Sequence, residues 1–302
     1  MGPAQMERVC RDQVDECPRP TCVNKTPQDK KAFNMTQITT PENMADMIPS
    51  GIKLGLAPDG LGSSPALTRL LIARHVRDLH VICAPIGGMQ VDMLIGSGAV
   101  AVLETSAVSL GESGGAPCFG RAVRNNEIRI LDATCPAIFA GLMAAQKGVP
   151  FMPIRGLIGS DVLRNRRDWK VVRNPFDEND AIVVVPAIQP DIALIHAAEA
   201  DRFGNVRLGR RREVMLLAHA SVKTFASVER ISETSLLADE RSAAGVLPAM
   251  YVTALAQCRN GARPTGLFNE YAPDNAEVER YAQAARSPEG FKAYMSNAMS
   301  EA

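Results

Sequence analysis

Residues 52–73 read IKLGLAPDGLGSSPALTRLLIA, and this stretch predicts a strand, a turn-rich loop and a helix in succession. The run 52–56 is mostly apolar and has the length of a buried strand. Residues 57–64 are rich in Gly, Pro, Asp and Ser, the residues that form turns and loops. A strand that leads through such a loop into a helix is the repeating unit of α/β proteins.

The helix that follows this loop has a clear beginning. Ser64 fits the N-cap position, and Pro65 fits the first helical position, where its missing N–H costs no hydrogen bond. Leu67, Leu70 and Leu71 then recur at the spacing of one buried helix face.

The same alternation extends over some 200 residues. We expect further strands at residues 79–84, 99–103, 128–131, 149–153, 181–185, 192–195 and 224–228. Further helices are expected at residues 136–146, ending near Gly148, at 213–221, and from 287 onward. Continuous apolar runs indicate strands that are buried on both faces. The fold class predicted is therefore α/β, with an open, mostly parallel sheet covered by helices on both faces.

One domain is expected over residues 36–302, since no interior linker interrupts the pattern. Residues 1–34 are polar and contain Pro18, Pro20 and Pro27, so we predict a disordered N-terminal extension. This segment has no apolar signal-peptide core, and no run of eighteen apolar residues exists. These features favour a cytoplasmic location.

Composition excludes several kinds of partner and cofactor. Lys plus Arg and Asp plus Glu each number 33, which argues against a nucleic-acid or membrane surface. Seven cysteines without paired spacing indicate reduced thiols. Cys17 and Cys22 supply only half of a zinc site, and no second Cys/His pair lies nearby, so no metal is expected.

Two loops after strands are candidates for ligand binding. Residues 58–64 would place free backbone N–H groups and a helix N-terminus near an anion, or Gly60 and Gly62 make only a tight turn. Gly87 and Gly88 follow the strand at 79–84, where glycine allows a ligand or another backbone to approach closely.

Other segments keep two interpretations. Residues 96–101 imitate the dinucleotide fingerprint G-x-G-x-x-A, but they lead into a strand and not into a helix. Residues 104–120 are crowded with hydroxyls, glycines and two carboxylates, so they form either a substrate-binding loop or a solvated connection. His196 ends an apolar strand and is interpreted as structural more readily than as catalytic. The arginines at 210–212 would meet a phosphate, or form a solvated face or a subunit contact.

Residues 192–206 carry a resemblance to a known family. They read as an aliphatic strand, His-Ala, two residues, Ala-Asp-Arg, one residue and Gly-Asn, which closely resembles A-type subunits of family I coenzyme A transferases, such as that of glutaconate CoA-transferase. Further blocks resemble the family in the same order, at residues 91–98, 148–153, 174–176, 224–231 and 247–252. One departure is Leu56-Ala57-Pro58, where many A-type subunits have Gly-Gly-Phe.

The resemblance implies a reaction and a partner. Such an enzyme moves CoA from an acyl-CoA to a free carboxylic acid through a glutamyl-CoA intermediate, and the glutamate belongs to a B-type subunit within a Ser-Glu-Asn-Gly-like motif. This chain lacks that motif, so the catalytic nucleophile is expected on the partner. Coenzyme A is then a substrate, and no cofactor is expected.

The substrate-binding side is predicted to face the partner's glutamate. Its expected members are small, polar or acidic: Gly87, Gly88, Ser106, Ser109, Glu112 and Ser113. Two other functions remain open on the same scaffold. They are a CoA-ester hydrolase or ring-opening enzyme, and a non-catalytic ligand-binding protein. The donor acyl-CoA, the acceptor acid and the size of the assembly are not specified by the sequence.

Overall fold

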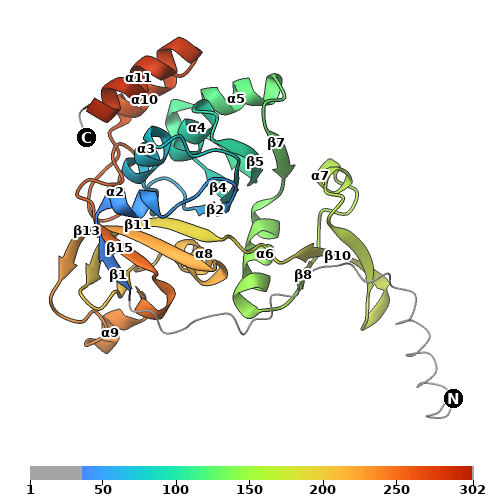
Figure 1. The fold of residues 1–302 in the computed structure, drawn as a ribbon. Coiled ribbons are helices and arrows are strands. Elements are labelled where there is room, and N and C mark those ends of the chain that lie inside the picture. The colour runs from blue at the N-terminus through green and yellow to red at the C-terminus, as the bar shows by residue number, and fades with distance from the viewer. Residues whose placement is uncertain (1–35, 301–302) are drawn as a thin grey trace. The chain divides into compact units, whose positions relative to one another are not determined.

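A computed structural model describes residues 36–300 of the chain (Figure 1). The predictions for residues 1–34, and for Cys17 and Cys22 within them, lie outside the described residues.

The main element is one large sheet whose eight principal strands are all parallel to their neighbours. Their order across the sheet is β1 (Gln37–Thr39), β15 (Ala254–Gln257), β13 (Lys223–Ser232), β11 (Ile192–Asp201), β2 (Lys53–Leu56), β3 (Leu79–Cys83), β5 (Val100–Thr105) and β7 (Arg129–Asp132). Two short strands, β12 (Val206–Arg207) and β14 (Val246–Leu247), extend it beside β11. The predicted open, mostly parallel sheet is confirmed.

Helices cover both faces of the sheet, as predicted (Figure 1). One face packs against α2 (Pro41–Asp46), α3 (Pro65–Ala73), α4 (Met89–Gly96), α5 (Pro117–Arg124), α10 (Asn275–Ala284) and α11 (Pro288–Ser300). The other face packs against α6 (Cys135–Lys147) and α8 (Arg212–Ala220). Along β11, Ile192 and Leu194 belong to the first core, whereas Ala193, Ile195 and Ala197 belong to the second. An apolar run can therefore be buried on both sides.

Several local predictions are confirmed with their physical causes. Helix α6 ends where Gly148 adopts the left-handed conformation, with φ of 69°. Gly96 closes α4, and Gly98, with φ of 72°, turns the chain into β5, so the fingerprint-like sequence ends a helix. Ser64 occupies the N-cap position of α3, but its side chain makes no capping hydrogen bond and contacts Ser227 instead.

One prediction about the sheet is wrong. The sequence places the apolar runs at 149–153 and 181–185 in the parallel sheet, but they form a separate antiparallel one in the order β8 (Phe151–Ile154), β10 (Asp177–Pro186), β9 (Lys170–Asn174). Val183 and Val185 are buried because this small sheet packs into the core that contains α6. The apolar run at 181–185 indicates that the strand is buried. It does not indicate which sheet the strand belongs to.

A buried ion pair connects the segment between α7 (Asp161–Asn165) and β9 to the large sheet. Arg166 follows α7 and donates to Glu104 of β5 at 2.7 Å and to Asp168 at 2.8 Å. It also donates to the carbonyl oxygen of Asp132, and its guanidinium lies over the ring of Trp169. Glu104, one of the two carboxylates in the 104–120 segment, is therefore structural.

The turn after β11 explains the most specific block of the sequence. Asp201 is buried, and its carboxylate accepts hydrogen bonds from the N–H groups of Phe203 and Asn205 and from the Asn205 amide. Gly204 has φ of 93°, which suits glycine in this turn. The Ala-Asp-Arg-x-Gly-Asn pattern thus encodes a turn that is stabilised by hydrogen bonds among its own residues.

Candidate functional site

The order of the strands places a crevice at the middle of the sheet. From β2 the chain builds outward through β3, β5 and β7, while β11, β13 and β15 follow on the other side of β2. The point where the order reverses lies between β2 and β11, and ligands of open α/β sheets bind beyond the carboxyl ends of strands at such a point. The loop 57–64 and the end of β11 meet here, since the N–H of His196 donates to the carbonyl of Gly62 at 2.8 Å.

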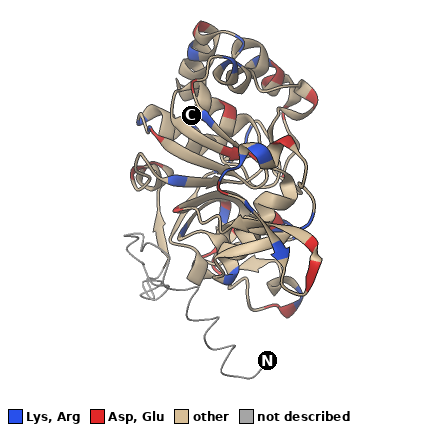
Figure 2. Cartoon of the chain, turned by 90° about the vertical axis from the view of Figure 1, so that its right-hand side faces the viewer, with Lys and Arg blue, Asp and Glu red and all other residues tan. Residues whose placement is uncertain are grey.

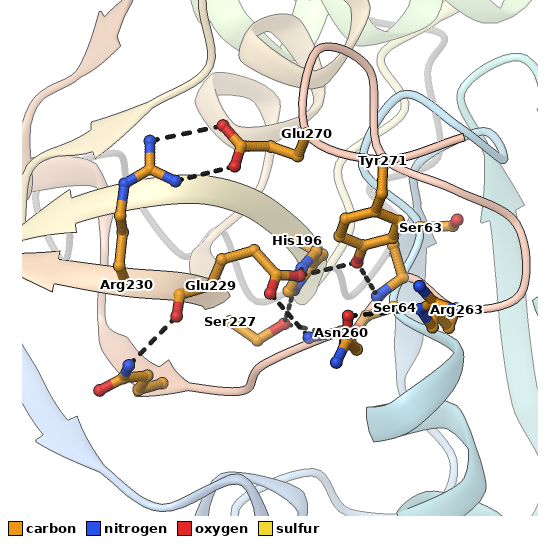
Figure 3. Close-up of polar contacts among 12 residues, drawn as sticks. Ser63, Ser64, His196, Ser227, Glu229, Arg230, Asn260, Arg263, Glu270 and Tyr271 are labelled. Atoms are coloured by element: carbon orange, nitrogen blue, oxygen red, sulfur yellow. Dashed lines mark hydrogen bonds and ion pairs between the residues drawn. The ribbon is translucent and has the colours of Figure 1, made fainter. Parts of the chain in front are cut away.

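A buried polar chain runs across this crevice (Figure 3). His196 is fully buried; its Nδ1 lies 2.8 Å from Ser227 Oγ and its Nε2 lies 2.8 Å from Glu229 Oε1. Ser64 Oγ lies 3.1 Å from Ser227 Oγ. An ionised Glu229 can only accept, so the proton facing it is carried by His196 Nε2.

The cluster has the residue types of a catalytic Ser-His-Glu triad, but its serine is not accessible to a substrate. Ser227 is fully buried, and its hydroxyl is enclosed by His196, Ser64 and the carbonyl of Ile195. A nucleophilic serine must reach a substrate carbonyl. We conclude that this chain of groups positions the surrounding loops.

Glu229 holds the loop that faces the crevice. The Tyr271 hydroxyl donates to its Oε1 at 2.7 Å, and the Asn260 N–H donates to its Oε2 at 2.7 Å (Figure 3). Burial alone would raise the pKa of the Glu229 carboxyl, but the hydrogen bonds from His196, Tyr271 and Asn260 outweigh it and lower that pKa. The carboxylate stays charged and fixes the 258–273 loop.

An open pocket of about 640 Å³ lies between this loop and the loop after β2. Its walls are formed by Asp59, Gly60, Leu61, Thr265, Gly266, Leu267, Phe268, Asn269, Glu270, Tyr271, Ala272 and Pro273. The two loops are bonded to each other, since the Phe268 N–H donates to the Gly60 carbonyl and Ser63 Oγ lies 2.8 Å from Thr265 Oγ1. The volume suits a small organic ligand.

Asp59 lines this pocket, and one of its two carboxylate oxygens has no hydrogen-bond partner among the described residues. Its Oδ2 accepts a hydrogen bond from the Met89 N–H at 2.7 Å, whereas its shielded Oδ1 has no hydrogen-bond partner among the described residues. Burial raises the pKa of Asp59 to about 6, against the lowering effect of Met89 and Ser63. A side chain at Gly88 would displace this carboxyl group, so glycine there has a steric reason.

The predicted site residues fall into two groups. Gly87, Gly88, Ser106 and Ser109 are brought together by a small parallel pair, β4 (Ile86–Gly87) and β6 (Ala107–Val108), with the Ser109 N–H donating to the Gly87 carbonyl. Glu112 and Ser113 follow on the short 3-10 helix η2 (Gly111–Ser113), which turns back onto Ser109 through the Gly111 N–H and the Gly114 carbonyl; Glu112 is exposed.

Ser106 has a neighbour that the sequence did not single out. Its hydroxyl donates to the Pro85 carbonyl at 3.0 Å and lies 3.2 Å from the thiol of Cys135, the first residue of α6. Cys135 is half-buried at the carboxyl edge beyond β7. The predicted group therefore lies at the same edge of the sheet as the crevice, two to three strands from β11, the strand of His196.

Sequence reasoning missed the residues that organise the crevice. The contacts of His196 support its interpretation as structural, but the sequence does not identify Glu229, Asn260 and Tyr271 as its partners. Each of them lies 33 or more positions from His196 along the chain, as the 2.8 Å contact between His196 and Glu229 illustrates. No local pattern marks such a set.

The arginines at 210–212 do not form a uniform solvated face. Arg211 is buried, and its guanidinium donates to the carbonyls of Leu208, Leu61 and Arg207. Burial lowers the pKa of Arg211. With Arg207 and Arg210 it lines a cavity of about 510 Å³ beside the pocket.

Two negative observations concern residues 36–300 alone. Within this range no three His, Cys, Asp or Glu side chains gather as ligands of a metal would. Across the same range no helix combines the length and the apolar character needed to cross a bilayer.

Fold and site together define an open α/β protein with a ligand crevice at its topological switch point. Residues 38–256 match the family model described as coenzyme A transferase. Because the match covers more than half of the chain, this chain belongs to the coenzyme A transferase family, and it is an enzyme of that family.

Three relatives illustrate the similarity. The chain is 30% identical to the cholesterol ring-cleaving hydrolase IpdA subunit of Rhodococcus jostii, over 83% of this chain and 88% of that protein. It is 26% identical to the A subunit of glutaconate CoA-transferase from Acidaminococcus fermentans, over 85% of both chains. The solved structure of that organism's glutaconate CoA-transferase matches with a TM-score of 0.79 at 24% identity, over 87% of this chain and 88% of the other. The structure of the decarboxylase AibA/AibB matches with a TM-score of 0.77 at 26% identity, over 89% of this chain and all of that one.

Proposed function

We propose that this chain is the A-type subunit of a heteromeric CoA transferase. The partner's glutamate attacks the thioester carbonyl of an acyl-CoA and releases the CoA thiolate, leaving an acyl-glutamyl anhydride. The thiolate then attacks the glutamyl carbonyl, which releases the acid and forms glutamyl-CoA. A second carboxylic acid takes the CoA by the reverse steps, so coenzyme A enters and leaves as a substrate.

The engagement of two glutamates, the buried Glu104 and the half-buried Glu229, carries this proposal. At the carboxyl edge of the sheet, Glu104 is bound by Arg166, and Glu229 is bound by His196, Tyr271 and Asn260. Neither is free to attack a thioester without breaking a buried ion pair or hydrogen-bond set. A nucleophile supplied by another polypeptide would complete the site.

An exposed apolar hairpin supports the proposal of a second polypeptide. Strand β9 is exposed along most of its length, and Phe176, between β9 and β10, is 97% exposed. Val171 is 52% exposed and Phe151 of β8 is 49% exposed. Figure 2, which views this side of the chain, shows Lys and Arg interspersed with Asp and Glu. Exposed large apolar side chains on this small sheet support a contact with a second polypeptide.

A second function has one specific observation in its favour. The relative with 30% identity is named a ring-cleaving hydrolase subunit. Hydrolysis on this scaffold would replace the acceptor acid with water. The two functions are separated by whether product formation requires a free carboxylic acid.

The test uses the full chain assembled with a B-type subunit from the same genome. After incubation with acyl-CoA, mass spectrometry should find a glutamyl-CoA adduct on the partner, and CoA release should depend on the acceptor acid. An adduct on this chain, or CoA exchange at full rate without the partner, would refute the proposal. Acceptor-independent release of CoA would favour the hydrolase.

A further inference from the structure

The cavity of about 510 Å³ beside the pocket is lined by three arginines, Arg207, Arg210 and Arg211. Among the described residues, its one acidic lining residue is Glu270. The charge of Glu270 is already balanced by Arg230, whose guanidinium donates to both carboxylate oxygens, at 2.8 and 3.4 Å (Figure 3). This arginine cavity therefore has a surplus of positive charge.

Two of the three arginines have no carboxylate partner within residues 36–300. Arg207 donates to Glu199 at 3.0 Å, which balances its charge. Arg210 is exposed, and its side chain makes no hydrogen bond or ion pair with the described residues. Arg211 is buried, and its guanidinium donates to three backbone carbonyls. Carbonyl oxygens satisfy hydrogen-bond donors, but they do not balance a buried charge.

Burial strengthens the effect of the Arg211 charge on the cavity. Burial lowers the pKa of Arg211, but a guanidinium titrates so far above neutral pH that it stays charged. A charge shielded from water attracts an anion more strongly than one in water. Arg211 is also the N-cap residue of α8, and the N-terminus of a helix adds partial positive charge. An anionic group is therefore favoured in this cavity.

The walls next to the arginine cavity indicate what the anion is attached to. The cavity shares Phe268, Asn269 and Glu270 with the pocket beside Asp59, so the two spaces adjoin. The remaining walls of the pocket include Leu, Ala, Pro and Tyr side chains, which suit a hydrocarbon chain. In coenzyme A the phosphates are flanked by polar groups, which suit these walls less well. The surroundings therefore favour a carboxylate at the end of an apolar chain.

We propose that the arginine cavity binds a distal carboxylate of the acyl group, whose hydrocarbon chain lies in the adjoining pocket. The preferred acyl group then derives from a dicarboxylic acid, with one carboxyl in the thioester and the other free. Arg210, which is exposed and lines the cavity, contacts this carboxylate, while Arg211 contributes its charge from a buried position. This inference rests on the proposed CoA chemistry, but binding of the carboxylate can be measured without turnover.

The probes are two N-acetylcysteamine thioesters, which carry no CoA phosphates. One is the glutaryl thioester with its free terminal carboxylate, and the other is the corresponding terminal amide, which has the same shape without the charge. Binding to the full chain, alone and assembled with the partner, is measured by calorimetry at pH 7 without phosphate or sulfate. We expect the carboxylate to bind about 10-fold more tightly than the amide, as for one charge-assisted contact with arginine.

Two neighbouring arginines provide a matched pair of variants. Arg210 and Arg212 are both exposed, but only Arg210 lines the cavity. Arg210→Gln should remove the preference for the carboxylate. Arg212→Gln changes the net charge of the chain by the same amount and should keep the preference. Circular dichroism of each variant confirms that it is folded.

Adenosine 3′,5′-bisphosphate tests the other source of an anion, because it carries phosphates of the kind found in coenzyme A. It should not displace the glutaryl thioester from the chain. Competitive displacement would assign the arginine cavity to a phosphate of CoA and overturn the inference.

The outcomes separate this inference from the proposed function. Equal binding of the carboxylate and the amide, or equal effects of Arg210→Gln and Arg212→Gln, would overturn the inference whether or not the assembly transfers CoA. A preference for the carboxylate in an assembly that forms no glutamyl-CoA and transfers no CoA would overturn the proposed function and leave the carboxylate site intact.

Discussion

Asp59 combines a buried carboxyl with a pKa above its ordinary value. Because the folded-state pKa is raised from 3.8 to about 6, ionisation of Asp59 costs stability as the pH rises through this range. Below about pH 3 the carboxyl is protonated in both states, and the cost is absent.

Asp59→Asn is therefore expected to stabilise the protein at high pH. The neutral amide keeps an acceptor for the Met89 N–H and removes the buried charge. The free energy of unfolding at pH 8 should exceed that of the unaltered chain by about 3 kcal/mol, and the difference should vanish below about pH 3. Urea unfolding at several pH values measures this. A constant difference from pH 4 to pH 8 would contradict the assignment.

Ser106 provides a test of the predicted substrate-binding group. Its hydroxyl is half-buried between the Pro85 carbonyl and the Cys135 thiol, so removing it leaves little void. Ser106→Ala should lower kcat/KM of the assembled enzyme about 10-fold, a loss typical of one substrate hydrogen bond. Association with the partner, followed by size-exclusion chromatography, should be unchanged. Ser109→Ala tests a second member of the same predicted group, and unchanged kinetics for both variants would remove the group from the site.

At the level of elements, the helices and strands followed their local signals. Pro65 and Gly148 mark helix boundaries that the structure confirms, because caps and turns are chemically local. The strand predicted at 192–195 begins at Ile192 as expected but continues to Asp201, since the residues after Ile195 are also paired with β13. The small antiparallel sheet could not be assigned from the sequence, since sheet membership depends on which distant segment covers a run. The network around His196 was unpredictable for the same reason. Its members meet only when β11, β13 and the 258–273 loop are assembled.

The segment that leads into β9 is held to the large sheet by a charge pair whose removal should be costly. Arg166 and Glu104 have side chains that are 3% and 5% exposed. Arg166→Met leaves Glu104 buried without its cation and should lower the free energy of unfolding by about 3 kcal/mol. Denaturant unfolding measures the change.

Arg164→Met is the matched control for this prediction. Arg164 lies two positions away and pairs with Asp161, but both side chains are more than 70% exposed. Solvent-exposed pairs contribute little to stability, so this variant should unfold at the same denaturant concentration as the unaltered chain. Equal losses in the two variants would show that burial is not the deciding factor.

At the scale of the whole molecule, the exposed hairpin should decide association. Phe176→Ser removes the most exposed aromatic side chain of the described residues without touching a core. We expect at least a 10-fold loss of affinity for the B-type subunit, measured by analytical ultracentrifugation. Val222→Ser alters another apolar residue, 50% exposed and next to the first residue of β13, and should leave association unchanged. Full affinity in Phe176→Ser would remove the hairpin from the interface.

The pairing of β1 with β15 has a consequence for synthesis on the ribosome. Ile38 of β1 pairs with Leu255 of β15, so β1 can join the sheet only after more than two hundred further residues have been translated. The central neighbours β2 and β11 impose the same kind of delay, since Leu54 must wait for Ile192. During synthesis the nascent chain therefore carries strands without their sheet neighbours until translation is nearly complete. We expect chaperones to be needed most during that interval.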